Sequence, residues 1–106
     1  MMKIIDIRKI EPALDIEEVT GTRFYTRDEL EAVNIRIVKG GHLKSHKTPV
    51  DCLFFVIRGK GEFEIGEEYV TLTKAQCVES PGEIPHAVTN VGDEELEFLV
   101  LKTPKP

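Results

Sequence analysis

The sequence of 106 residues has no tryptophan, two cysteines and almost no side-chain amides. Cys52 and Cys77 are too few for a disulfide framework, so we expect two free thiols, with a single bridge as the alternative. The only side-chain amides are Asn34, Asn90 and Gln76, whereas isoleucine, glutamate and lysine are plentiful. That balance is typical of thermophilic proteins.

Long hydrophobic runs and basic clusters are also absent. The longest apolar segments, 52–57 and 98–101, fall far short of the roughly 20 residues that a membrane-spanning helix needs. Charged residues begin at Lys3, so no signal peptide is predicted and a cytoplasmic protein is expected. The net charge of -5 and the lack of any Lys/Arg run argue against nucleic acid or an anionic membrane as a partner.

Helical periodicity is missing as well, and a period of two takes its place. Val33, Ile35 and Ile37 alternate with polar residues, and similar short segments follow to the end of the chain, separated by glycine, proline and acidic turns. We therefore expect one all-β domain over residues 1–106, with about eight to ten short strands and little or no helix. Isoleucines in 3–10 predict an N-terminal strand that packs on the sheet or on a partner subunit.

The predicted strand 51–58 is apolar on both faces. From Cys52 to Ile57 every side chain is apolar, so both alternating faces need to be covered. The core covers one face. The N-terminal strand or a second copy of the chain would cover the other, and we expect a homodimer.

Two stretches carry histidines between turns, and their residues resemble the two sequence motifs of the cupin family. The motif positions that the chain retains are Gly40, His46, Gly59, Pro81, His86 and Asn90. Thr48 and Cys52 replace the second histidine and the glutamate of the first motif, and Ala75 and Glu83 replace glycines of the second. The resemblance covers about residues 31–101. It implies a small single-domain, RmlC-like cupin with a double-stranded β-helix or jelly-roll barrel.

The resemblance also implies a metal site, because three histidines and a glutamate of the full motif hold divalent Zn, Fe, Mn or Ni inside the barrel. His46 and His86 are the predicted ligands here. Cys52 is a candidate third ligand as a thiolate, and His42 is another because it shares parity with His46 in a regular strand. Asp51 is a minor candidate that would need a bulge to turn inward.

Each candidate has a structural alternative. The two histidines could instead bond a ligand or each other, Cys52 could be a buried thiol, and His42 could be exposed. The family likeness predicts a pocket that is lined by Thr48, Phe54, Phe63, Val88 and Phe98.

The leading hypothesis is a small-molecule-binding cupin with a degenerate pocket that binds one divalent transition metal. One alternative is a metal-dependent enzyme of the dioxygenase or sugar isomerase type. The other is a metal-free ligand-binding or sensor module that uses the same histidines. The sequence leaves open whether the protein is an enzyme.

Overall fold

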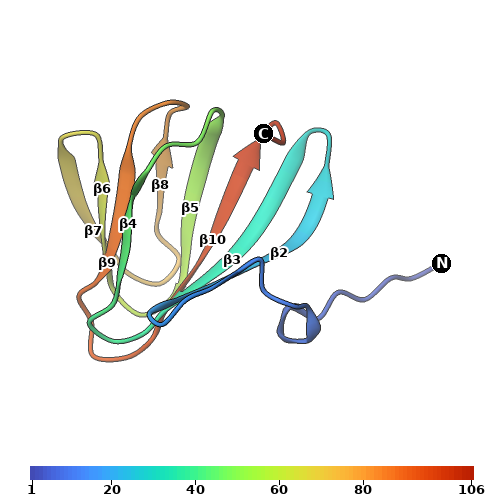
Figure 1. Cartoon of the computed structure of the whole chain (residues 1–106), viewed down its shortest axis with the longest axis horizontal. Helices are drawn as coiled ribbons and strands as arrows, with labels where there is room; N and C mark the ends of the chain where they lie inside the picture. The colour runs from blue at the N-terminus through green and yellow to red at the C-terminus, as the bar shows by residue number, and fades with distance from the viewer.

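The computed structural model describes residues 1–106 as a β-barrel made of two antiparallel sheets (Figure 1). Its strands are β1 (Leu14–Asp15), β2 (Val19–Arg27), β3 (Leu30–Ile37), β4 (His42–His46), β5 (Asp51–Arg58), β6 (Gly61–Ile65), β7 (Glu68–Leu72), β8 (Cys77–Ser80), β9 (His86–Asn90) and β10 (Leu96–Thr103). The order is β1-β2-β3-β10-β5-β8 in one sheet and β4-β9-β6-β7 in the other. The only helical element is a 3-10 turn, η1 (Ile7–Lys9), so the predicted all-β jelly roll is confirmed.

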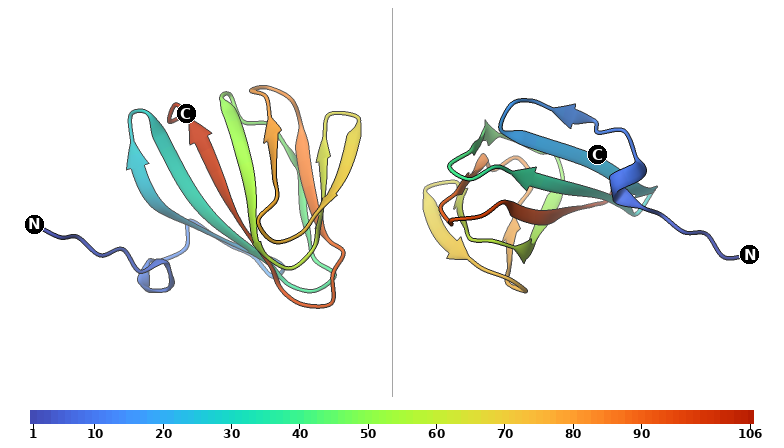
Figure 2. Two further views of the ribbon diagram at one scale, coloured as in Figure 1. Left: turned by 180° about the vertical axis from the view of Figure 1, so that it is seen from behind. Right: turned by 90° about the horizontal axis from the view of Figure 1, so that it is seen from below.

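A hydrophobic core of 12 buried residues fills the space between the two sheets. Its largest side chains are Phe54, Phe63 and Phe98, none more than 1% exposed, and their ring centroids lie 5.3 to 6.0 Å apart. Burying each such side chain stabilises the fold by about 1.5–3 kcal/mol. The strands converge at one end of the barrel and spread apart at the other (Figures 1 and 2). We call this spread end the open end of the barrel.

The register of the larger sheet arranges the inward side chains in rows. Val33 on β3 pairs with Val100 on β10, Val100 pairs with Phe54 on β5, and Phe54 pairs with Val78 on β8. Directly paired residues on one face of a sheet lie about 4.5–5.5 Å apart at their Cβ atoms. This apolar row therefore closes the core below the open end.

The predicted N-terminal strand over 3–10 is wrong. Ile4 and Ile5 are 84% and 42% exposed, and the Asp6 carboxylate accepts a hydrogen bond from the Arg8 backbone N–H to begin η1. An isoleucine-rich segment becomes a strand only where a neighbouring strand accepts its hydrogen bonds, and no strand of either sheet pairs with residues 3–10.

β2 lies outside the strands predicted from the sequence. Its threonines, arginines and glycine hide the apolar alternation, and a shift in its pairing with β3 between Arg23 and Tyr25 breaks the period further. Pairing with β3 from Val19 to Arg27 fixes the strand instead. Tertiary pairing thus overrides a weak local pattern.

The outer face of β5 remains open. Phe55 is 36% exposed there, and Leu99 on β10 pairs with it. The N-terminal segment instead lies near Asn34, Arg36 and Glu97. No helix of the structure combines the length and the apolar character that crossing a bilayer requires.

Two motif glycines allow a matched test of the turns. Gly59 has φ +88°, and a Cβ there would lie 2.7 Å from the Glu95 carbonyl oxygen, whereas Gly40 has φ +76° and open space around it. We expect Gly40→Ala to cost about 1 kcal/mol of unfolding free energy through backbone strain alone. Gly59→Ala should cost about 3 kcal/mol, because the backbone must also shift. Urea denaturation measures both, and equal losses would contradict the steric argument.

Candidate functional site

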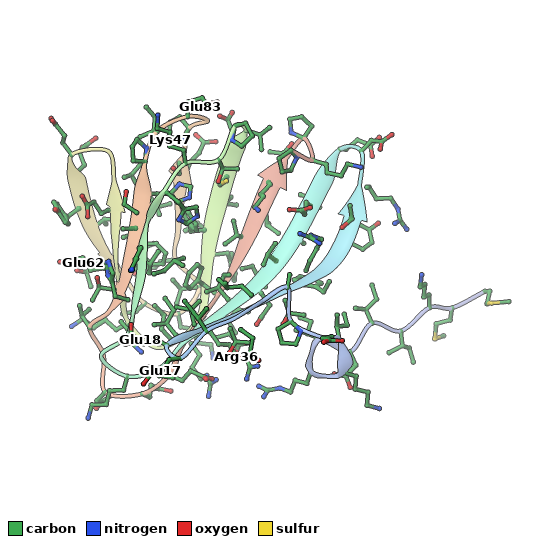
Figure 3. The ribbon with its side chains drawn as sticks, in the orientation of Figure 1. Glu17, Glu18, Arg36, Lys47, Glu62 and Glu83 are labelled. Carbon is green, nitrogen blue, oxygen red and sulfur yellow. The ribbon has the colours of Figure 1, made fainter.

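The antiparallel pairing of β4 with β9 brings His46 opposite His86. Their Nε2 atoms are 3.2 Å apart, and the rings meet edge to face with centroids 4.5 Å apart. His86 is 2% exposed, whereas His46 is open to solvent. Figure 3 shows Lys47, the neighbour of His46, and Glu83 at the open end, and the Glu83 backbone N–H donates to the Thr48 carbonyl. The histidine pair therefore lies at the open end of the barrel.

When both imidazoles are neutral, their hydrogen bonds have one consistent direction. The Lys44 carbonyl oxygen can only accept, so His46 donates from Nδ1 over 3.0 Å and keeps Nε2 as an acceptor. His86 then donates from Nε2 to His46, and its Nδ1 accepts from the Ser80 hydroxyl over 3.0 Å. A chain of three hydrogen bonds thus runs from the buried Ser80 to the solvent-exposed strand β4.

The environment keeps His86 neutral. Desolvation is the main cause that lowers the pKa of His86 from 6.5 to about 4, and electrostatic interactions with His46 and Lys102 act in the same direction. The ring of Phe54 meets that of His86 edge to face, with centroids 5.1 Å apart. His86 is therefore a neutral hydrogen-bonding group at physiological pH.

The structure does not bring His42 to this pair. Its Nδ1 lies 2.8 Å from the Thr89 hydroxyl, and its backbone N–H donates to the Glu18 carboxylate. Glu18 lies at the end of the barrel opposite Lys47 (Figure 3). The β4–β9 register shifts by one residue between Leu43 and His46, and this bulge breaks the parity on which the prediction for His42 depended.

Cys52 and Thr48 lie close together near the histidine pair, but neither belongs to a group of metal ligands. Cys52 is 1% exposed on the inner face of β5, directly across from Ser80 on β8. Desolvation raises the pKa of the Cys52 thiol, although a hydrogen bond from the buried Thr48 hydroxyl partly opposes this. Cys52 is therefore a protonated thiol at neutral pH, as its structural alternative predicted, and both cysteines are free.

Asp51 does not turn into the barrel. It pairs with Thr103 on the outward parity of β5, and its carboxylate accepts a hydrogen bond of 2.8 Å from the Gly82 backbone N–H. Gly82 packs so closely that a Cβ would lie 2.9 Å from the Pro49 carbonyl oxygen. Asp51 thus fastens the loop that leads to His86.

Four predicted lining residues belong to the core. Val88 and the three phenylalanines Phe54, Phe63 and Phe98 are all members of the buried cluster, and none is more than 1% exposed. Only Phe54 stacks against a site histidine. These residues form the apolar floor below His86 rather than an accessible wall.

Sequence reasoning missed a polar row above that floor. Glu31 on β3 pairs with Lys102 on β10, Lys102 pairs with Cys52 on β5, and Cys52 pairs with Ser80 on β8. All four side chains point inward, as those of the apolar row do. The polar row lies nearer the open end, and the apolar row lies one step deeper in the barrel. The signal was present in the period of two, because Lys102 continues the series of Phe98 and Val100.

The residues present do not fit the resident metal centre that the full cupin motif would build. The two imidazoles are suitable nitrogen ligands, but no group of three or more His, Cys, Asp or Glu side chains converges anywhere in the structure. Thr48 offers a neutral hydroxyl, and Cys52 offers a thiol whose burial opposes ionisation. Only a weak two-imidazole site could form.

A large surface hollow lies away from the histidine pair. It measures about 1060 Å³ and contains neither histidine of the pair, and its lining includes Arg8, Gly59, Lys60, Lys74 and Asp93. Its lysines and Asp93 are exposed, and neither histidine nor cysteine lines it. The buried, titratable groups at the open end mark the more specific site.

The pKa of His86 predicts acid sensitivity. In metal-free buffer, the unfolded chain takes up a proton near pH 6.5 while folded His86 resists until about pH 4. The contribution of His86 to the free energy of unfolding should therefore be fully present above pH 6.5. It should fall as the pH drops towards 4 and then level off. The total loss should be about 1.4 kcal/mol per unit of pKa difference. Urea unfolding of wild type and His86→Gln measures this contribution, with His42→Gln as control. Identical pH profiles of wild type and His86→Gln would contradict it.

Several solved structures share this architecture. KdgF from Halomonas sp. has a TM-score of 0.85 at 17% sequence identity, covering 100% of this chain and 96% of that chain. A predicted oxalate decarboxylase from Thermotoga maritima has a TM-score of 0.83 at 16% identity, covering 97% and 100%. An RmlC-like cupin from Methanocaldococcus jannaschii has a TM-score of 0.80 at 15% identity, covering 98% and 92%. At these identities the likeness concerns the fold alone.

The family is assigned from the sequence match. No match was found among curated protein sequences. Residues 33–102 match the family model that is described as a cupin domain, which spans most of the chain and includes both histidine-bearing strands. Together with the double sheet and its inward histidine pair, this match establishes that the chain belongs to the cupin family.

Proposed function

We propose that this cupin binds a small polar molecule at His46 and His86, in a degenerate pocket that does not depend on a resident metal. The observation that carries the proposal is the directed hydrogen bond between a buried neutral imidazole and an exposed one, 3.2 Å apart. Buried polar groups that reach solvent at the open end of a barrel are the usual anchors of a small ligand.

The pair offers complementary groups to such a ligand. When a ligand separates the two rings, Nε2 of His86 can donate to a ligand oxygen and Nε2 of His46 can accept from a ligand hydroxyl. Ser80 and the Lys44 carbonyl hold the two Nδ1 atoms and so keep both rings oriented. A polar molecule with an acceptor and a hydroxyl close together matches this arrangement.

Ligand and metal measurements test this function. We expect sorbitol or gluconate to shift the NMR signals of both imidazoles in wild type and in His42→Ala, but not to bind His46→Ala or His86→Ala. Protein exposed to Fe, Mn, Ni and Zn, then dialysed, should retain much less than one ion per chain, because two imidazoles form an incomplete set of ligands. Metal mass spectrometry reads the second result. A stoichiometric ion lost on His46→Ala would favour the metal-dependent enzyme instead.

We also propose that the outer face of β5 and β10 binds a second copy of the chain. An uncharged row of Leu53, Phe55, Leu99 and Leu101 crosses these two strands at their paired positions. A patch without charge can pack against its own copy about a two-fold axis. The N-terminal segment projects away from the barrel with exposed apolar residues, which are available to contact the second copy (Figure 2).

Light scattering after gel filtration tests the dimer. Phe55→Lys should convert a two-chain species into a single chain, because it places a charge in the centre of the apolar row. Tyr69→Lys is the matched control, since Tyr69 is 63% exposed on β7 in the other sheet. A wild type that elutes as a single chain at high concentration would contradict the proposal.

A further inference from the structure

The polar row at the open end contains an unusual charge arrangement. Glu31 is 7% exposed, and each of its carboxylate oxygens has its own cation: Arg23 Nε at 3.1 Å and Lys102 Nζ at 3.2 Å. One carboxylate between two cations leaves one positive charge uncompensated. The Lys102 side chain is only 24% exposed, so water screens this charge less than it would screen a surface lysine.

Lys102 lies within electrostatic reach of the histidine pair. Its charge helps to lower the pKa of His86, and it opposes the desolvation that raises the pKa of Cys52, so its field reaches both side chains. In the sheet, Cys52 alone separates Lys102 from Ser80, the partner of His86. Lys102 forms an ion pair with one oxygen of Glu31, and an ammonium carries three N–H donors, so donors remain for a ligand.

No second carboxylate pairs with Lys102. Asp51 bonds the Gly82 N–H on the outer side, and Glu31 is already paired. Lys47 and Glu83 both lie on the rim and oppose each other in sign (Figure 3). The three ionised side chains of this cluster therefore sum to one positive charge, although the whole chain carries -5.

From this arrangement we infer that the ligand is a small hydroxycarboxylate, whose carboxylate binds Lys102 and whose hydroxyl binds the histidine pair. The inference rests on the proposed function, because it places the ligand at His46 and His86. A monoanion matches the single excess charge. A phosphate dianion would exceed it, and the nearest guanidinium, that of Arg23, is already paired with Glu31.

Paired probes separate charge from shape. Gluconate and sorbitol have the same carbon chain and differ in one terminal carboxylate, and inorganic phosphate tests the alternative anion. Titrations followed by the His46 and His86 imidazole signals should give tighter binding for gluconate than for sorbitol or phosphate. Added salt should weaken the gluconate interaction most.

Two substitutions should act in opposite directions. Lys102→Met removes the binding cation. It should weaken the binding of gluconate about tenfold and leave the binding of sorbitol unchanged. Glu31→Gln removes the ion-pair partner of Lys102 and should tighten the binding of gluconate several-fold. Lys60→Met, at an exposed residue of the separate surface hollow, controls for the loss of one charge. Thermal unfolding of each variant verifies that it is folded.

The outcomes separate this inference from the proposed function. If sorbitol shifts the imidazoles as strongly as gluconate, or if Lys102→Met leaves gluconate binding intact, the carboxylate assignment is wrong while the histidine site stands. Tighter binding of phosphate than of gluconate would also overturn it. If no probe, including a wider set of two- to six-carbon hydroxy acids and polyols, shifts either imidazole, both proposals fail.

Discussion

The pairing register of β3, β10, β5 and β8 is the constraint on which both the core and the site depend. It sets an apolar row through Phe54 directly below a polar row through Lys102. Because side chains alternate between faces, a slip of one residue would exchange the inner and outer faces of a strand. The slip would expose the aromatic core and bury the outward polar groups, so the packing of the phenylalanines also holds the site in place.

Local pattern was enough to predict most of the fold. Strands from Val33 onwards either alternate or form short apolar runs, and turn residues separate them, so the local pattern found them. The pattern failed where pairing partners decide the outcome. The isoleucines near Ile4 pair with no strand, and β2 is held by β3 despite its polar side chains. Neither fact can be seen within a short window of sequence.

The site was predictable only in part for a similar reason. Motif spacing singled out His46 and His86, and the structure places them in contact. The bulge in β4 that separates His42 from them contains no proline or glycine from which it could be predicted. Ser80 and Lys102 were not predicted, because neither is a position of the metal-binding motif, although both side chains point inward from their strands. Replacing the motif glutamate with Cys52 leaves a protonated thiol, and neutral hydrogen bonding takes the place of a charged ligand shell.

The bulge in β4 has a second consequence, for association between copies of the folded chain. β4 is an outermost strand of the smaller sheet, and such a strand presents unpaired backbone groups to any extended segment. Its irregular register, with the exposed Lys44 and Ser45 at the bulge, leaves no straight row of donors and acceptors for another strand to follow. The distortion that removes His42 from the histidine pair also guards the barrel against growth into an extended intermolecular sheet.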